Sequence, residues 1–214
     1  MNNSLDAYRN VLREIDKFES PTFTVGDFNY FYNSSIDEYI ATNHAIFDVT
    51  QKTLDDISVI LVLGEDLSFT NGEADLPAKY RHMLGLETVL KFLETMDGIS
   101  KDTLRTVYPK RMRTNRKGFA RQNAYQDPSY KNSSFQIAKG KLKVLNGSGT
   151  EVQSGKIDYI ETPEKMFLNP DPSVDFNDPA NNTPLQFPQH VNFEIVKHCK
   201  KIFLENIESQ RYKS

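Results

Sequence analysis

Apolar residues recur every three or four positions at both ends of the chain, which is the spacing of one face of an α-helix. Ser4 is a suitable N-cap for a first helix. The apolar face of this helix comprises Leu5, Tyr8, Leu12, Ile15 and Phe18. A second amphipathic run follows Thr24, and the pattern then predicts a long helix over about residues 36–59. Near the other end, residues 192–210 predict a helix that is apolar over a wide arc.

Between these ends the hydrophobic period changes to two, which is typical of β-strands. Residues 67–76 alternate around the pair Asn71-Gly72, a strong signal for a tight hairpin turn. Residues 141–160 predict a second hairpin. Residues 84–93 are apolar enough for a strand or a short helix, and periodicity does not separate the two. The middle of the chain is therefore predicted to be β-rich.

Residues 169–188 carry five prolines among many Asp and Asn, which indicates an extended loop. A loop of this length is usually a functional arm, an interface segment or a disordered segment. The patterns together predict an α+β fold: N-terminal helices including one long helix, a central antiparallel β-body of hairpins, and a C-terminal helix. We expect one structural domain over residues 1–214, with a helical part at 1–61, a β-rich body at 62–168, an extended arm at 169–190 and the last helix at 191–212.

Length and composition narrow the class of protein. The 214 residues are 38% hydrophobic and 26% charged, values typical of a folded globular protein and not of a disordered chain. No apolar run approaches the ~18 residues of a transmembrane helix, and the N-terminus lacks the pattern of a secretory signal, so we expect neither a membrane protein nor a secreted one. Cys199 is the single cysteine, which excludes a disulfide within one chain.

The net charge of −3 conceals a segregation along the chain. Residues 1–102 hold 8 Lys or Arg against 18 Asp or Glu, whereas residues 103–126 hold 7 basic residues and no acidic one. Residues 127–214 hold 11 of each sign. Opposite charges on different parts of one surface favour self-association or docking on a charged neighbour, because complementary potentials steer encounter.

The sequence contains no complete motif for phosphate binding, metal binding or nucleophilic catalysis. The glycines at 147, 149 and 155 lack the spacing and the hydroxyl residue of a phosphate-binding loop. The four histidines, at 44, 82, 190 and 198, are scattered, and the neighbours His198 and Cys199 point apart on a helix, so no metal site is expected. The sequence contains no Gly-X-Ser-X-Gly motif, and Cys199 reads as a packed thiol. We predict no enzyme, no cofactor, no metal and no catalytic residue.

One basic segment remains as a candidate interface or DNA-facing element. Its six basic residues, within twelve positions, are Lys110, Arg111, Arg113, Arg116, Lys117 and Arg121. They could dock on acidic protein, for which the first 102 residues of a neighbouring copy are an obvious target. They could also bind nucleic acid through its phosphates, or form an ordinary solvated surface.

Several strings then occur in the order found in one protein family. The sequence Leu76-Pro77 with Tyr80 is similar to its Leu-Pro-X-X-Tyr element, and residues 123–130 are similar to a loop rich in Asn, Pro and Tyr, with Ala124 where Pro is expected. The other matching stretches are residues 28–33, 47–57, 158–163 and 194–212. Over roughly residues 24–212, the chain resembles the neck or connector (head-to-tail) ring proteins of tailed bacteriophages, particularly those of the crAss-like phages.

The resemblance implies a virion structural protein that forms a homo-oligomeric ring of about twelve copies in the portal-vertex neck. Its implied partners are copies of itself, the portal protein, the adjacent neck or tail rings and the genomic DNA in the lumen, with no membrane. Such a protein is made in the host cytoplasm and functions in the virion. The family has no catalytic residues to carry over. The alternative is a nucleic-acid-binding accessory protein that uses the basic segment over residues 110–121.

Overall fold

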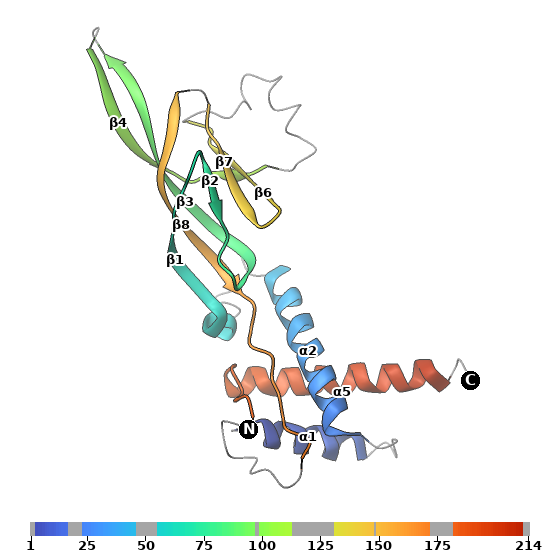
Figure 1. Cartoon of the computed structure of the whole chain (residues 1–214). Coiled ribbons are helices and arrows are strands. Elements are labelled where there is room, and N and C mark those ends of the chain that lie inside the picture. Colours follow the sequence, from blue (N-terminus) through green and yellow to red (C-terminus); the bar gives the residue numbers. More distant parts are fainter. Residues whose placement is uncertain are drawn as a thin grey trace. The chain divides into compact units, whose positions relative to one another are not determined.

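The computed structural model describes residues 3–16, 23–45, 55–96, 99–112, 131–147, 149–171 and 182–211. The chain forms two compact units (Figure 1). The helical unit comprises Met1–Val59 and Pro163–Ser214, and the β unit comprises Ile60–Thr162. Helices and antiparallel sheets are both present, which confirms the predicted α+β class. The single domain expected over residues 1–214 stays a prediction, because two compact units can fold together or separately.

Within its described residues, the helical unit contains the helices α1 (Ser4–Asp16), α2 (Val25–Ala45) and α5 (Gln189–Arg211). The predicted cap of α2 is confirmed, because the Thr24 hydroxyl accepts a bond from the Asp27 N–H at 3.1 Å and the Asp27 carboxylate accepts one from the Thr24 N–H at 2.9 Å. The cap of α1 is Asn3 and not Ser4. The Asn3 side chain accepts a bond from the Asp6 N–H at 2.8 Å, while the Ser4 hydroxyl donates to the Thr183 carbonyl.

The predicted long helix over residues 36–59 is wrong in its boundaries. Helix α2 begins at Val25, so the run after Thr24 and the start of the predicted helix form one element. Residues 46–54 lie outside the described residues. A short helical turn follows at 55–57, then the 3₁₀ turn η1 (Ser58–Ile60), and Leu61 already belongs to a strand. The C-terminal helix is confirmed, with α5 starting slightly earlier than predicted.

Aromatic side chains from all three helices form much of the core of the helical unit. Phe28 is fully buried on α2, with the rings of Tyr8 and Tyr32 at centroid distances of 5.3 and 5.2 Å. Phe203 on α5 packs edge-on against Phe23 at 4.6 Å. Rings from the three helices therefore meet each other. On α1 the buried face comprises Ala7, Val11 and Ile15, whereas the predicted Leu5, Tyr8 and Leu12 are half-buried. None of the helices in the described part of the chain is long and apolar enough to cross a membrane.

Cys199 lies fully buried on α5, and burial raises the pKa of its thiol to about 12. Because only the thiolate reacts with alkylating reagents, we expect native protein at pH 8 to be labelled by iodoacetamide about 100-fold more slowly than protein in concentrated urea. Mass spectrometry of timed samples measures both rates. Equal rates would contradict the burial of this side chain. If Cys199 is labelled slowly, a cysteine introduced at the surface can be modified selectively in the native protein.

An extended strap, residues 163–171, lies along α2 in the helical unit. Asn33 donates to the Met166 carbonyl at 2.8 Å and accepts from the Met166 N–H at 2.8 Å. One turn earlier, Asn29 forms the same pair with Leu168, with both distances 2.9 Å. The two side-chain amides thus bond to the backbone N–H and C=O groups of the strap, as a neighbouring strand would. The side chains of Met166 and Leu168 are buried.

The strap changes the description of the predicted arm. Residues 163–168, expected at the end of the β-body, contain no strand. Residues 169–171 and 182–188 have no regular secondary structure, as predicted for the loop, and residues 172–181 lie outside the described residues.

The β unit contains two four-stranded sheets. Sheet A has the strand order β1-β8-β3-β4, and sheet B has the order β2-β7-β6-β5. The strands of sheet A are β1 (Leu61–Leu67), β3 (Tyr80–Met96), β4 (Ile99–Val107) and β8 (Thr150–Glu161). The strands of sheet B are β2 (Glu73–Asp75), β5 (Lys110–Arg111), β6 (Ser134–Ala138) and β7 (Lys141–Leu145). Both sheets contribute to one apolar core, in which Leu90, Leu142 and Ile157 are fully buried.

The first predicted hairpin is confirmed at its turn but not along its flanking strands, and the second is wrong in its strand pairing. Thr70 and Glu73 pair antiparallel across Asn71-Gly72, with N–H to carbonyl distances of 2.8 and 3.0 Å. Asn71 and Gly72 do form a tight turn, with φ values of 53° and 76°, but the flanking strands β1 and β2 belong to different sheets. Strands β7 and β8 likewise separate into sheets B and A. One hairpin that forms within sheet B joins β6 to β7 through Lys139-Gly140, whose φ values are 53° and 75°. Residues 84–93 are strand, within β3.

Candidate functional site

The structure places only the start of the predicted basic segment. Lys110 and Arg111 form β5, an exposed two-residue strand parallel to β6 at the edge of sheet B. The Lys110 N–H donates to the Ser133 carbonyl at 3.1 Å, and the next ladder bond joins Met112 to Phe135. The other four candidates, Arg113, Arg116, Lys117 and Arg121, lie outside the described residues.

Electrostatic, aromatic and hydrogen-bond interactions run from Arg111 on β5 to Glu65 on β1. The positive charge of Arg111 acts on Tyr80 and opposes the burial that raises the pKa of that phenol. The Tyr80 ring lies 6.0 Å from the ring of Tyr159, and the Tyr159 hydroxyl donates to Glu65 on β1 at 2.6 Å. Burial and the Glu65 carboxylate raise the pKa of Tyr159 to about 12. Glu65 is thereby held in place at the edge of sheet A.

Replacing Tyr159 with Phe should lower the free energy of unfolding by about 1–2 kcal/mol at pH 7, since it removes a hydrogen bond to a charged group. A raised native pKa means that this contribution is complete below pH 10 and is lost as the pH rises towards about 12. Urea titrations at pH 7 and pH 11 measure both effects. Tyr108→Phe is the control, because Tyr108 is 72% exposed. An equal loss in both variants would contradict the role of the Tyr159 hydroxyl.

Strands β1 and β4 are the two edges of sheet A, and within the described residues neither has a second neighbour. The ladder between β1 and β8 shifts register between Val62 and Glu65, and Gly64 in this bulge has a φ of 68°. Strand β4 pairs with β3 without interruption over all nine of its residues. Sheet A therefore has one bulged edge and one regular edge.

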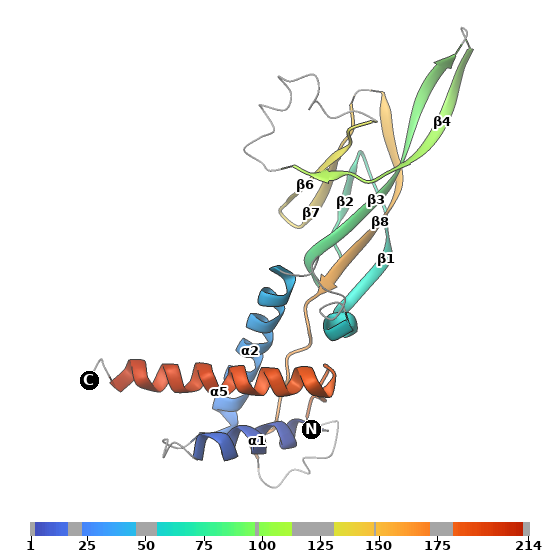
Figure 2. The same ribbon diagram turned by 180° about the vertical axis from the view of Figure 1, so that it is seen from behind.

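Strands β3 and β4 extend past β8 as a two-stranded ribbon (Figures 1 and 2). The β3·β8 ladder ends at Phe92 opposite Thr150, whereas β3 and β4 continue to pair up to Met96 opposite Ile99. Leu93 and Leu104 on this hairpin are 61% and 65% exposed. A ribbon with exposed leucines and an open edge is typical of a surface that another protein covers.

Sequence patterns could have located this ribbon. Asp97-Gly98 is a hairpin turn signal as strong as Asn71-Gly72, and it separates two runs of alternating residues. Periodicity over residues 84–93 alone does not reveal this turn. Lys91 and Asp102, which form an ion pair of 2.8 Å, lie on the same face of the ribbon as the two leucines because paired residues share a face.

A polar cluster in the helical unit involves Asp56, His190 and Tyr39. His190 Nε2 lies 2.6 Å from one carboxylate oxygen of Asp56, and the Tyr39 hydroxyl donates to the other at 3.4 Å. Burial and the charge of Asp56 raise the pKa of Tyr39. These contacts attach the helical turn at 55–57 to α2 and to the start of α5, which is a structural role. The described residues contain no group of three or more potential metal ligands.

A groove of about 1000 Å³ lies between α1 and α5. Its lining combines apolar Phe193, Val196 and Leu204 with basic side chains from both helices. Lys200 binds Glu14 at 3.2 Å and Lys201 approaches Glu205 at 3.8 Å, so two of these positive charges are already neutralised within the groove. With Arg13 and Lys197 added, the lining keeps a net charge of +2, and the described residues do not show what covers the groove.

Comparison with models of known protein families and with curated proteins finds no match for this chain. The candidate functional site is the pair of open edges of sheet A together with the β3–β4 ribbon, because these carry unpaired strand edges and exposed leucines.

Proposed function

We propose that the chain is a virion structural protein that forms a homo-oligomeric ring in the neck of a tailed bacteriophage. The ring would link the portal protein to the tail and surround the channel through which the genomic DNA passes. The observation that carries this proposal is the combination of two open edges and an exposed leucine-bearing ribbon in one sheet. A repeating assembly needs two different surfaces on each copy, and the two edges supply them.

The charge pattern supports association between copies. The acidic first half of the chain and the basic segment that starts at Lys110 are complementary, and the segment starts at an exposed sheet edge. Contacts of this kind fix the orientation of neighbours more than they add affinity. In a neck, the same segment would have acidic surfaces of adjacent rings or DNA phosphates within reach.

Sedimentation velocity of the purified full chain, followed by negative-stain imaging, tests the ring directly. We expect a concentration-dependent oligomer with closed, ring-shaped projections. A protein that stays monomeric up to about 100 μM, alone and with its portal, would overturn the proposal, because interfaces of standard size hold at such concentrations.

Charge reversal tests the role of the basic segment. The variant Arg111→Glu, Arg113→Glu and Arg116→Glu should block completion of particles if the segment docks on acidic protein. A matched control reverses three exposed lysines elsewhere, Lys139, Lys165 and Lys197. Normal infectivity of the first variant would remove the segment from the interface. Binding of short DNA that falls steeply between low and moderate salt would instead favour the nucleic-acid-binding alternative.

A further inference from the structure

The number of strands in sheet A determines how its two edges can meet. All four strands are antiparallel to their neighbours, so β4 runs opposite to β1. If copies repeat around an axis with their sheets side by side, β4 of one copy lies antiparallel to β1 of the next. The sheet then continues from copy to copy in the pairing that it already uses within one chain.

The two edges carry opposite charges on the same face. On β8, Ile157 is opposite both Glu65 on β1 and Leu86 on β3, so these three residues share a face. Further along β3, Leu90 lies on the same face as Leu86, and Leu90 is opposite Arg105 on β4. Glu65 on β1 and Arg105 on β4 therefore lie on the core-facing side of sheet A. Both side chains are exposed. One Glu65 oxygen accepts the bond from Tyr159, which leaves the other for a neighbouring copy.

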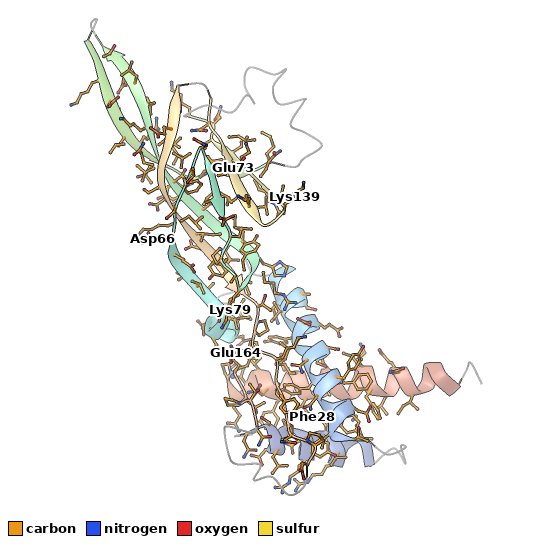
Figure 3. All side chains as sticks on the ribbon, in the orientation of Figure 1. Phe28, Asp66, Glu73, Lys79, Lys139 and Glu164 are labelled. Atoms are coloured by element: carbon orange, nitrogen blue, oxygen red, sulfur yellow. The ribbon has the colours of Figure 1, made fainter. Side chains whose placement is uncertain are left out.

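The charges on the opposite face are largely satisfied within one copy. Asp102 pairs with Lys91 at 2.8 Å, and Asp66 on β1, labelled in Figure 3, lies 4.0 Å from Lys156. The edge strands also carry exposed leucines, Leu63 on β1 at 68% and Leu104 on β4. Pairing of the edges would bury apolar surface together with one acidic and one basic side chain.

A symmetric pairing of identical edges is disfavoured by the same charges. If two β4 strands paired antiparallel over their full length, Thr103 would lie opposite itself and Lys101 opposite Arg105, twice. Like charges directly opposite each other destabilise a sheet. Two β1 strands would bring together two copies of Glu65 and Asp66. The charges therefore select the unlike pair of edges.

From these observations we infer that neighbouring copies join by pairing β4 of one copy antiparallel to β1 of the next, with Arg105 opposite Glu65. In this register Asp66 lies opposite Leu104 and Leu67 lies opposite Thr103. The bulge at Val62–Glu65 ends the ladder, so the seam is short and its register is fixed. The inference rests on the proposed function for the identity of the partner, which is a second copy of this chain.

Charge exchange between two protein preparations tests the seam. Alone, Glu65→Arg places two basic side chains at every seam, and Arg105→Glu places two acidic ones. Each variant should weaken the association constant of every seam about tenfold, which corresponds to ~1.4 kcal/mol per seam, and sedimentation at a fixed concentration should show a lower assembled fraction. In an equimolar mixture that alternates around a ring, every seam pairs one acidic with one basic side chain. The mixture should assemble to within about twofold of the wild-type level.

Disulfide trapping provides a second measurement on the intact chain. The double variant Glu65→Cys and Arg105→Cys should form a ladder of covalent oligomers under mild oxidation, since the native Cys199 is buried. The control combines Arg105→Cys with Lys156→Cys, because Lys156 lies on β8 in the middle of the sheet. Circular dichroism and urea unfolding of each variant show whether the fold is retained, and the double cysteine variant keeps the readout valid if Glu65→Arg fails to fold.

The outcomes separate the two proposals. Rescue by mixing, together with a ladder only in the seam variant, supports the inference. Rings that form normally in both charge variants, with no ladder, would overturn the seam and leave the ring proposal standing. A wild-type chain that never associates, alone or with its portal, would overturn both.

Discussion

Replacing Gly155 with Ala should lower the free energy of unfolding by about 3 kcal/mol, one of the largest effects expected for a single added methyl group. Gly155 lies on β8 in the interior of sheet A, opposite Leu67 on β1 and Thr88 on β3. A Cβ at this position would lie 2.7 Å from a ring carbon of Phe69 and 2.9 Å from the carbonyl oxygen of Glu87. The ring can rotate, but the carbonyl belongs to the backbone of β3 and cannot move without disturbing the ladder.

The control for this prediction is Gly26→Ala. Gly26 lies in the first turn of α2, where the nearest atom to an added Cβ is the Thr24 hydroxyl at an ordinary 3.6 Å. Because Ala restricts the unfolded chain, this variant should be neutral or more stable by up to about 1 kcal/mol. Urea unfolding measures both variants. A Gly155→Ala protein as stable as wild type would contradict the close packing of β3, β8 and Phe69.

Replacing Asn33 with Asp should cost about 3 kcal/mol in the helical unit at pH 7. The Asn33 amide donates to the carbonyls of Met166 and Asn29, at 2.8 and 2.6 Å. A carboxylate has the same shape but no donor, and it would face both carbonyl oxygens with a negative charge. Lowering the pH to 4 should reduce the loss, because a protonated carboxyl regains one donor.

Asn43→Asp is the matched control on the same helix. The Asn43 amide also donates to the carbonyl one turn earlier, that of Tyr39 at 3.0 Å, but the structure shows no bond from it to the strap. Its replacement should cost about 1 kcal/mol. Chemical unfolding of both variants, followed by circular dichroism at 222 nm, measures the difference. Equal losses would show that Asn33 does not hold the strap.

Local signals predicted the parts of the fold that short segments determine. The Thr24 cap, the C-terminal helix and the turn at Asn71-Gly72 depend on neighbouring residues, and all three are confirmed. Strand pairing was not predictable in this way. Strand β1 pairs with β8, about 90 residues later, and alternation along either strand contains no information on the identity of its partner.

The strap and the sheet edges illustrate the same limit. Asn29 and Asn33 bond to backbone groups more than 130 residues away in the sequence. The helical periodicity places both amides on α2 but does not identify these distant partners. The sequence predicted a β-rich body but not which strands end each sheet. The inferred pairing of Glu65 with Arg105 depends on the ladder registers, because these place both residues on one face.

The proposed function is tested most directly by cryo-electron microscopy of tailed phage particles whose genome carries this sequence. We expect a closed ring of identical copies beneath the portal, with density that fits the helical unit and the β unit. Within that ring, sheet A should continue from one copy to the next. Particles whose complete neck contains no copy of this chain, together with a monomeric protein in the host cytoplasm, would contradict the account.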